Sequence, residues 1–253
     1  MKLAYNTLEW GPTPDLARML DEIKRTGWDG WEVRQSLDWL GSAERVAAVS
    51  KEAGLPVAGV CGQGWNFADD PVVFEINCRR IEFAADVGAD AFVIMAPERP
   101  ENRPPSTDEI NRFAAAAEAL RKLGADQGTT VVFHFHTGQL VQTEQEIRRV
   151  LDAAPDLQLC IDVSHAQLIG WDACECLREF AGRLAYVHLQ DYRGWRYVNV
   201  GAGDLFPSIP AIFKTLDEIE YDGWVVCHGG RLVDQPPRER ARVSREYLRS
   251  IGR

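Results

Sequence analysis

The five histidines of this 253-residue chain, His134, His136, His165, His188 and His228, each lie at the end of a short apolar run. The first two close the run Val-Val-Phe-His-Phe-His one residue apart, so alternation along a strand points both imidazoles to the same side. Neutral imidazole binds borderline divalent metals and moves protons near neutral pH. If the runs are parallel strands, the five rings converge on one edge of a sheet. We therefore expect a metal centre or an acid–base site at that edge.

Carboxylates accompany the histidines. Asp162 ends one apolar run, and Asp191 lies three residues after His188. Carboxylate oxygen and imidazole nitrogen together favour a borderline divalent ion such as Mn, Zn, Co or Fe. For any single histidine, a hydrogen-bonded strand end is an equally good interpretation, but five at one edge favour a metal. Taking one ligand from each of the last four expected strands gives the set His134, Asp162, His188 and His228, with His136 as the alternative to His134.

The candidate acid–base groups are His165, His136 and Glu32. Glu32 ends the second expected strand, where a carboxylate could hold a substrate hydroxyl or move a proton. An ion pair with Arg34 or with another cation at the same edge is the competing interpretation.

The candidate substrate contacts are Asn6, Trp65 and Arg193. Asn6 ends the first expected strand, and the other two residues lie in long loops. An aromatic face such as that of Trp65 can stack on a sugar ring, although packing of the loop is the simpler interpretation.

Short apolar runs alternate with stretches of helical period along the whole chain. The expected strands are 3–6, 30–34, 57–61, 91–95, 130–134, 157–162, 184–188 and 223–228. The expected helices are 14–26, 42–53, 71–87, 107–127, 144–154, 172–181, 207–219 and 237–251, and no histidine lies in any of them. Eight alternating units predict a (β/α)8 TIM barrel of the α/β class. Because no linker or composition break divides the chain, we expect one domain over residues 1–253.

Local signals mark several helix starts. Pro14 after Thr13 suits a first helical position, and the patterns Ser106-x-x-Glu109 and Thr143-x-x-Glu146 are typical of capping boxes. The longest loops, 62–71, 96–106 and 189–206, all follow strands. In a barrel, such loops form the face that carries the active site.

Composition restricts the classes of partner. The formal net charge is −10 with both signs mixed along the chain, which argues against a nucleic-acid partner. No apolar run reaches the roughly 18 residues that a membrane span needs, and the N-terminus is too short and polar for a signal peptide. The six cysteines form no C-x-x-C pair and are expected to be free, buried thiols. We therefore expect a cytoplasmic protein.

Several motifs, taken in order, resemble the xylose-isomerase-like TIM-barrel superfamily over almost the whole chain. These are Met1–Asn6, Gly27–Glu32, Asp162–His165, His188–Asp191 and Tyr221–Trp224. The superfamily holds sugar isomerases, keto-sugar 3-epimerases, hydroxypyruvate isomerases and inosose dehydratases. The run from His134 to Gly138, followed by Val141-Gln142-Thr143, is most similar to the inosose dehydratases.

The resemblance implies metal positions at Asp162 and His188 and a substrate contact at His165. Many members of the superfamily carry glutamates on strands five and eight, where this chain has Val132 or His134, and His228. A lysine common before the aspartate that follows the strand-seven histidine is Gln190 here. A site without those glutamates cannot shuttle a proton as the epimerases do. More nitrogen ligands shift the preference from magnesium toward zinc, cobalt, iron or manganese.

The residues and the resemblance together predict a metal-dependent enzyme that acts on a small sugar, keto-sugar or keto-polyol. We expect proton abstraction next to a carbonyl that the metal polarises, followed by isomerisation, epimerisation or dehydration. One alternative is a catalytically altered barrel that binds a sugar or a partner protein. Another is an endonuclease IV-type DNA repair enzyme, which would need more carboxylate ligands and a basic groove. The helical outer ring would permit a homo-oligomer.

Overall fold

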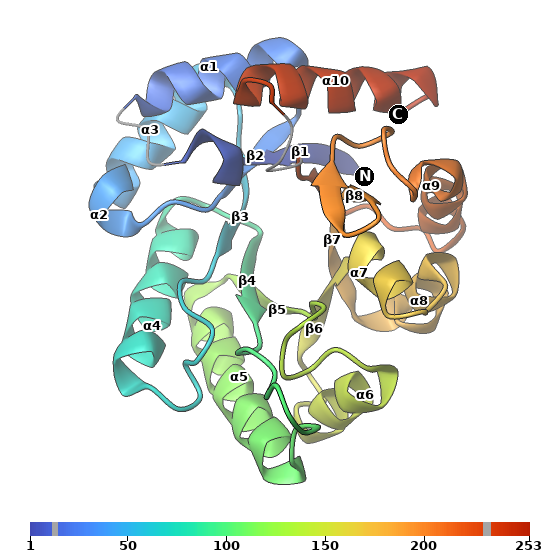
Figure 1. Cartoon of the computed structure of the whole chain (residues 1–253). Coiled ribbons are helices and arrows are strands. Elements are labelled where there is room, and N and C mark those ends of the chain that lie inside the picture. The colour runs from blue at the N-terminus through green and yellow to red at the C-terminus, as the bar shows by residue number, and fades with distance from the viewer. Residues whose placement is uncertain (12–14, 230–233) are drawn as a thin grey trace.

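A computed structural model describes residues 1–11, 15–229 and 234–253 (Figure 1). Eight parallel strands close into a barrel in the order β1-β10-β7-β6-β5-β4-β3-β2. The strands are β1 (Lys2–Asn6), β2 (Gly30–Val33), β3 (Val57–Cys61), β4 (Ala91–Met95), β5 (Thr130–His134), β6 (Gln158–Asp162), β7 (Leu184–Leu189) and β10 (Trp224–Cys227). Every expected strand is found within a residue or two of its predicted bounds, so the predicted TIM barrel is confirmed.

Helices surround the barrel, and α1 lies beside α10 (Figure 1). The α-helices are α1 (Leu16–Thr26), α2 (Leu37–Leu40), α3 (Ala43–Ala53), α4 (Pro71–Asp86), α5 (Thr107–Gln127), α6 (Glu144–Ala153), α7 (Val163–Leu168), α8 (Ala173–Glu179), α9 (Ile209–Glu218) and α10 (Pro237–Ser250). Three 3-10 turns add η1 (Thr7–Trp10), η2 (Ala181–Arg183) and η3 (Phe206–Ser208). No described helix is both long enough and apolar enough to cross a bilayer.

The predicted helix starts follow local capping chemistry. Ser106 with Glu109 and Thr143 with Glu146 both form complete capping boxes, as predicted. The predicted start of the first helix at Pro14 lies outside the described residues, and within them the Asp15 side chain accepts a hydrogen bond from the Arg18 amide.

The inside of the barrel is filled mostly by small side chains and two large rings. Ala4, Ala58, Cys61, Ala91 and Cys160 belong to a buried cluster that also holds Tyr186 and Trp224. Tyr186 fits because its neighbour on the opposite wall is Gly59, where an added Cβ would lie 2.6 Å from the tyrosine hydroxyl. This packed interior closes the barrel below the carboxyl ends of the strands, so that those ends form the floor of any site above.

The structure corrects two expectations. His165 lies inside a helix, α7, because the Asp162 side chain accepts hydrogen bonds from the Ser164 and His165 amides and so caps a helix directly after β6. The expected loop 189–206 also contains an antiparallel hairpin formed by β8 (Asp191–Arg193) and β9 (Arg196–Val198). Both elements lie at the carboxyl ends of the strands, next to the site.

Candidate functional site

A cavity of about 300 Å³ opens at the carboxyl ends of the strands. It is lined by Leu8, Arg34, Trp65, Met95, His134, His136, Gln139, His188, Gln190, Tyr197, His228 and Gly229. Four of the five histidines therefore face one space, as predicted from their positions at strand ends. Polar groups converging in a concave site at this end of a barrel are typical of an active site.

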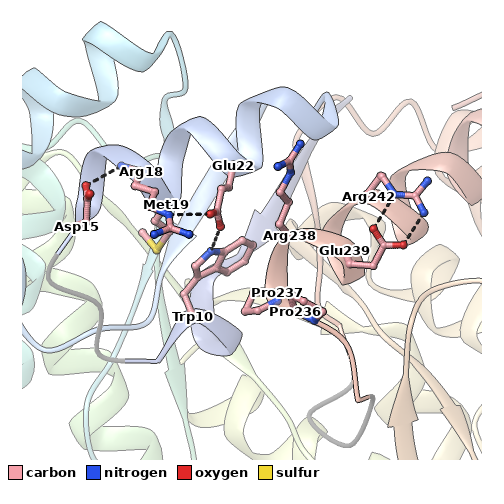
Figure 2. Close-up of a pocket in the computed structure, with 10 residues that line it drawn as sticks. All are labelled: Trp10, Asp15, Arg18, Met19, Glu22, Pro236, Pro237, Arg238, Glu239 and Arg242. Carbon is pink, nitrogen blue, oxygen red and sulfur yellow. Dashed lines mark hydrogen bonds and ion pairs between the residues drawn. The ribbon is translucent and has the colours of Figure 1, made fainter.

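A larger cavity, of about 720 Å³, lies between α1 and α10 (Figure 2). Figure 2 shows the Trp10 ring nitrogen and Arg18 both meeting Glu22, while Arg242 pairs with Glu239. Most of its charged groups thus neutralise each other, and no histidine or cysteine is among its described lining residues. We therefore take the smaller cavity as the candidate site, because its lining residues include four histidines and those of the larger cavity include none among the described residues.

The four predicted metal ligands meet because they end neighbouring strands. The barrel order places β10, β7, β6 and β5 side by side, and Asp162 pairs in register with His188. His134 Nε2 lies 3.5 Å from Asp162 Oδ2. The ring of His188 lies 4.9 Å from that of His134 and 4.6 Å from that of His228, between ring centroids. The structure therefore brings all four residues to one place.

Glu32 joins this group from the opposite side of the barrel. Its fully buried carboxylate lies 2.8 Å from His188 Nε2 and accepts a hydrogen bond from the Asn6 side-chain amide. Burial alone would raise the pKa of Glu32, but His188 holds it below its usual range. Among the ion pairs of the described residues, the partner of Glu32 is His188 and not Arg34. Glu32 is thus placed to orient His188 or to act as a further ligand.

The nitrogen atoms of the site fit a metal ion. His134 Nδ1, His188 Nδ1 and His228 Nε2 are buried and have no hydrogen-bond partner within the described part of the chain. Burying an unpaired polar atom is costly, whereas a metal ion would satisfy such a lone pair. Three overlapping groups have ligand atoms within 4.8 Å of one another: Glu32, His188 and His228; His134, Asp162 and His165; and His134, Cys160 and His188.

The protonation states also suit a metal. Burial lowers the pKa of His134 to about 4 and that of His228 well below its usual range, so both are neutral at pH 7. Burial opposes ionisation of Asp162, but His165 and His134 hold its pKa well below the usual value. One Asp162 oxygen accepts a 2.6 Å hydrogen bond from the Ser164 hydroxyl, and the other accepts one of the same length from Gln190. Neutral imidazoles and an ionised, oriented carboxylate are the forms that bind metal.

A second group of side chains lies beside the predicted ligands. His136 lines the cavity, and its ring centroid is 3.6 Å from that of His165, which is fully buried. The two ring nitrogens of His165 meet the Thr137 hydroxyl at 3.0 Å and the Tyr197 hydroxyl at 3.4 Å. Tyr197, from β9, lines the cavity between His165 and the open space. Its position follows from the hairpin, which the sequence interpretation treated as loop.

The three predicted substrate contacts have different surroundings. Trp65 lines the cavity, with the Arg34 guanidinium 5.8 Å from its ring centroid. Asn6 is buried, donates to Glu32 and accepts from the Leu8 amide, so it supports Glu32 from behind. Arg193 is exposed on the hairpin, donates to the Ala202 carbonyl and is not among the cavity-lining residues. Its contact with substrate stays a prediction.

Asp191 has a structural position. Its side chain is buried and accepts hydrogen bonds from four backbone amides, those of Tyr192, Gly201, Gly203 and Leu205, at 2.9–3.0 Å. Every oxygen of this carboxylate is therefore used to fix the hairpin and the loop after it.

An eight-stranded α/β barrel with histidines and carboxylates at the carboxyl ends of its strands defines a class of barrel whose active sites occupy that face. Within this class, the chain belongs to the xylose isomerase-like TIM barrel family, whose model matches residues 20–251.

Curated relatives include inosose dehydratases. That of Clostridium perfringens (strain ATCC 13124) is 30% identical over 158 residues, covering 53% of this chain and 52% of that protein. That of Mesomycoplasma hyopneumoniae (strain 7448) is 24% identical over 281 residues, covering 96% of this chain and 91% of that protein. In several such matches the chain thus spans about half the length of the relative.

Solved structures share the fold. The 3-keto-D-glucoside 4-epimerase of E. coli superposes with a TM-score of 0.83 at 24% identity, covering 99% of this chain and 98% of that one. An L-ribulose 3-epimerase superposes with a TM-score of 0.84 at 18% identity, covering 99% and 94%. The chain therefore shares its fold with these two epimerases.

Proposed function

We propose that the chain is a divalent-metal-dependent enzyme that removes a proton beside the carbonyl of a small keto-sugar or keto-polyol. The observation that carries this proposal is the convergence of His134, His188 and His228 on one cavity, each with an unpartnered buried nitrogen, and with the buried Asp162 carboxylate 3.5 Å from His134. Mn, Zn, Co or Fe suits this donor set and, when bound, would supply Lewis-acid polarisation of a carbonyl.

His136 is the proposed base. It lines the cavity, and its Nδ1 lies 2.6 Å from the Thr137 carbonyl oxygen, to which it can only donate. That hydrogen bond leaves Nε2 with a free lone pair, which could accept a proton from a bound substrate. Burial lowers the pKa of His136, which keeps the ring neutral near pH 7.

His165 and Tyr197 form the proposed hydroxyl donor on the same wall. Burial is the main cause that raises the pKa of Tyr197, so its hydroxyl keeps its proton. With His165 Nε2 at 3.4 Å behind it, this hydroxyl can hold or return a proton at the substrate. Glu32 orients His188 and is a further candidate for a ligand or a base.

Proton return to another carbon or face gives isomerisation or epimerisation, whereas loss of a neighbouring hydroxyl gives dehydration. The relatives named inosose dehydratases support the lyase outcome, and the epimerase structures support the same carbonyl chemistry. A small carbohydrate, not a nucleic acid, is the proposed partner, because Arg34 is the single Lys or Arg among the described lining residues. The six free thiols support a cytoplasmic location.

Elemental analysis of the purified protein and of single variants tests the proposal. We expect about one Mn, Zn, Co or Fe per chain, lost in His134→Ala and His228→Ala. His136→Ala is the matched control, because it removes a histidine of the same cavity and should retain the metal while losing turnover on keto-sugars. Absence of metal under every loading condition would overturn the proposal and favour a barrel that only binds a sugar or a partner. Metal loss in His136→Ala but not in His134→Ala would make His136 the metal ligand and His134 the candidate base.

A further inference from the structure

Among the described residues that line the cavity, Arg34 carries a permanent positive charge and forms no ion pair with a carboxylate. Arg34 follows β2 directly, and its side chain is partly buried in the cavity wall. None of the ion pairs found among the described residues involves it. An arginine side chain keeps its proton in proteins, so the Arg34 guanidinium is charged. A half-buried guanidinium that faces a cavity without a paired carboxylate is a site for an anion.

Trp65 makes this cation a better binding group. The ring lies beside the guanidinium, 5.8 Å from it, and both side chains line the same cavity. An aromatic face next to a guanidinium holds it by cation–π attraction and keeps water from part of its surface. Hydrogen bonds from a fixed and partly dehydrated guanidinium to an anion are stronger than those in water.

The balance of buried charge points the same way. Glu32 and Asp162 are the carboxylates of the site, and both are fully buried. Arg34 and the buried Arg80 oppose them, and the acceptors of Arg80 within the described part of the chain are two neutral carbonyls, those of Cys61 and Gln35. Two negative and two positive groups therefore cancel before any metal binds. A divalent ion would then leave an excess of positive charge in a poorly solvated place. A neutral sugar would not reduce this excess charge, whereas an anionic ligand would.

We propose that the substrate of this site is an acid, and that Arg34 binds its carboxylate beside the reacting carbonyl. This inference rests on the proposed function and names its substrate class as sugar acids that carry a ketone. A carboxylate fits better than a phosphate because Arg34 is the single Lys or Arg among the described lining residues, and one guanidinium matches the single charge of a carboxylate better than the double charge of a phosphate. A volume of about 300 Å³ also suits a molecule of about six carbons.

A matched pair of ligands tests the substrate class. 2-Keto-D-gluconate and D-fructose share the C2 ketone and the configuration of C3 to C5, and differ in having a carboxylate or a hydroxymethyl group at C1. Calorimetric titration of the metal-loaded protein should show about ten- to hundredfold tighter binding of the acid, the range expected for a charge-assisted hydrogen-bonded pair. Equal affinities, or tighter binding of D-fructose, would overturn the proposal.

Two variants locate the effect. Arg34→Met should abolish the preference for the acid, and Arg34→Lys should keep part of it, because a lysine retains the charge without the paired donors. Arg79→Met is the control, since Arg79 lies exposed on α4 and its ion-pair partner among the described residues is Glu75; it should keep the full preference. A preference that survives in a folded Arg34→Met protein would overturn the assignment to Arg34.

Two further measurements separate the competing explanations. Metal content, measured in the same samples, tests the proposed function by itself, and the metal-free protein should still prefer the acid because Arg34 remains. A metal-loaded protein without that preference would leave the proposed function standing and remove only the substrate class. D-Fructose 1-phosphate carries its negative charge at the same end, and tighter binding of this ester than of 2-keto-D-gluconate would overturn the choice of carboxylate.

Discussion

His188 is the residue at which the two sides of the site meet. Its ring lies next to those of His134 and His228, and one of its nitrogens contacts Glu32 from across the barrel. Such a carboxylate contact fixes the orientation of a histidine and raises its basicity as a ligand. The contact depends on strand register, because β1 and β2 pair Asn6 with Glu32 and so bring the amide to the carboxylate.

Glu9 is another carboxylate with a buried side chain, outside the proposed ligands. Its side chain is 2% exposed and lies 3.1 Å from the Tyr5 hydroxyl and 3.7 Å from Arg240. Burial raises the pKa of Glu9 to about 7 from 4.5, although Arg240, Tyr5 and the Gly229 amide oppose the shift. A raised carboxyl pKa means that the folded state holds the proton more tightly than the unfolded state does. The resulting stabilisation is full below pH 4.5 and is lost as the pH rises through about 7.

The free energy of unfolding should therefore fall by roughly 2–3 kcal/mol between pH 5 and pH 8 because of Glu9 alone. Glu9→Gln should lack this part of the pH dependence, since glutamine stays neutral and can still accept a hydrogen bond from Tyr5. Urea unfolding at several pH values measures the difference, and Glu52→Gln, an exposed change on α3, serves as the control. Parallel pH profiles for the wild type and Glu9→Gln would refute the assignment.

At the scale of elements, the Asp191 side chain is the main anchor of the hairpin β8–β9. Each Asp191 oxygen accepts two backbone hydrogen bonds, and the chain approaches so closely that a Cβ at Gly203 would lie 2.3 Å from Oδ1. The same hairpin carries Tyr197 into the cavity. Loss of this anchor should therefore disturb the wall of the site without touching a proposed ligand.

Asp191→Asn should place an amide NH₂ against two backbone N–H donors and cost about 1–3 kcal/mol of stability. Turnover should fall because Tyr197 is no longer fixed, while the metal content stays unchanged. Thermal unfolding, elemental analysis and kcat measured together test this. Asp172→Ala, at the start of α8, is the comparison, because it removes a helix cap that is remote from the hairpin. Full activity in Asp191→Asn would contradict the positioning role of the hairpin.

Elements with local signals could be predicted from the sequence. Strand runs such as 57–61, 91–95 and 130–134, and both capping boxes, depend on neighbours only a few residues away, and the structure has them at the predicted positions. The hairpin could not be predicted in this way. Its strands are three residues long, its turn Gly194-Trp195 carries an exposed tryptophan, and its main anchor, Asp191, contacts residues up to fourteen positions later.

The same difference holds for the site. The grouping of His134, Asp162, His188 and His228 follows from strand order alone, because parallel strands end at one edge. Tyr197 takes its place in the cavity through the hairpin, so no sequence pattern selects it, whereas Arg34 ends an expected strand and is expected there only as an ion-pair partner of Glu32. Helical periodicity does not predict that His165 lies in a helix. The helix α7 has six residues and begins directly after β6 at the Asp162 cap, so it is too short to show a periodic apolar pattern.

For the whole molecule, the proposed ligands connect four adjacent strands of the closed barrel, β5, β6, β7 and β10. An ion bound by the folded chain alone stabilises it by RT ln(1 + [L]/Kd), or about 4 kcal/mol at a thousandfold excess over Kd. Removal of metal with a chelator should therefore lower the Tm by several degrees. Calorimetry with and without chelator measures the shift, which His188→Ala should lose and His136→Ala should keep. An identical shift in both variants would place the ion elsewhere.

The division of the site along the chain has a consequence for how the protein can diverge. All four proposed ligands come after residue 130, whereas Arg34 and Trp65 come well before it, in the first half of the chain. The substrate-binding part and the metal-binding part of the proposed site can therefore change independently in evolution. Substitutions around Arg34 can change which substrates bind, while the later strands keep the metal ligands and the reaction. Recombination of early and late barrel segments between relatives should thus yield new substrate ranges, provided that Glu32 is retained as the group that reaches from the first part to His188.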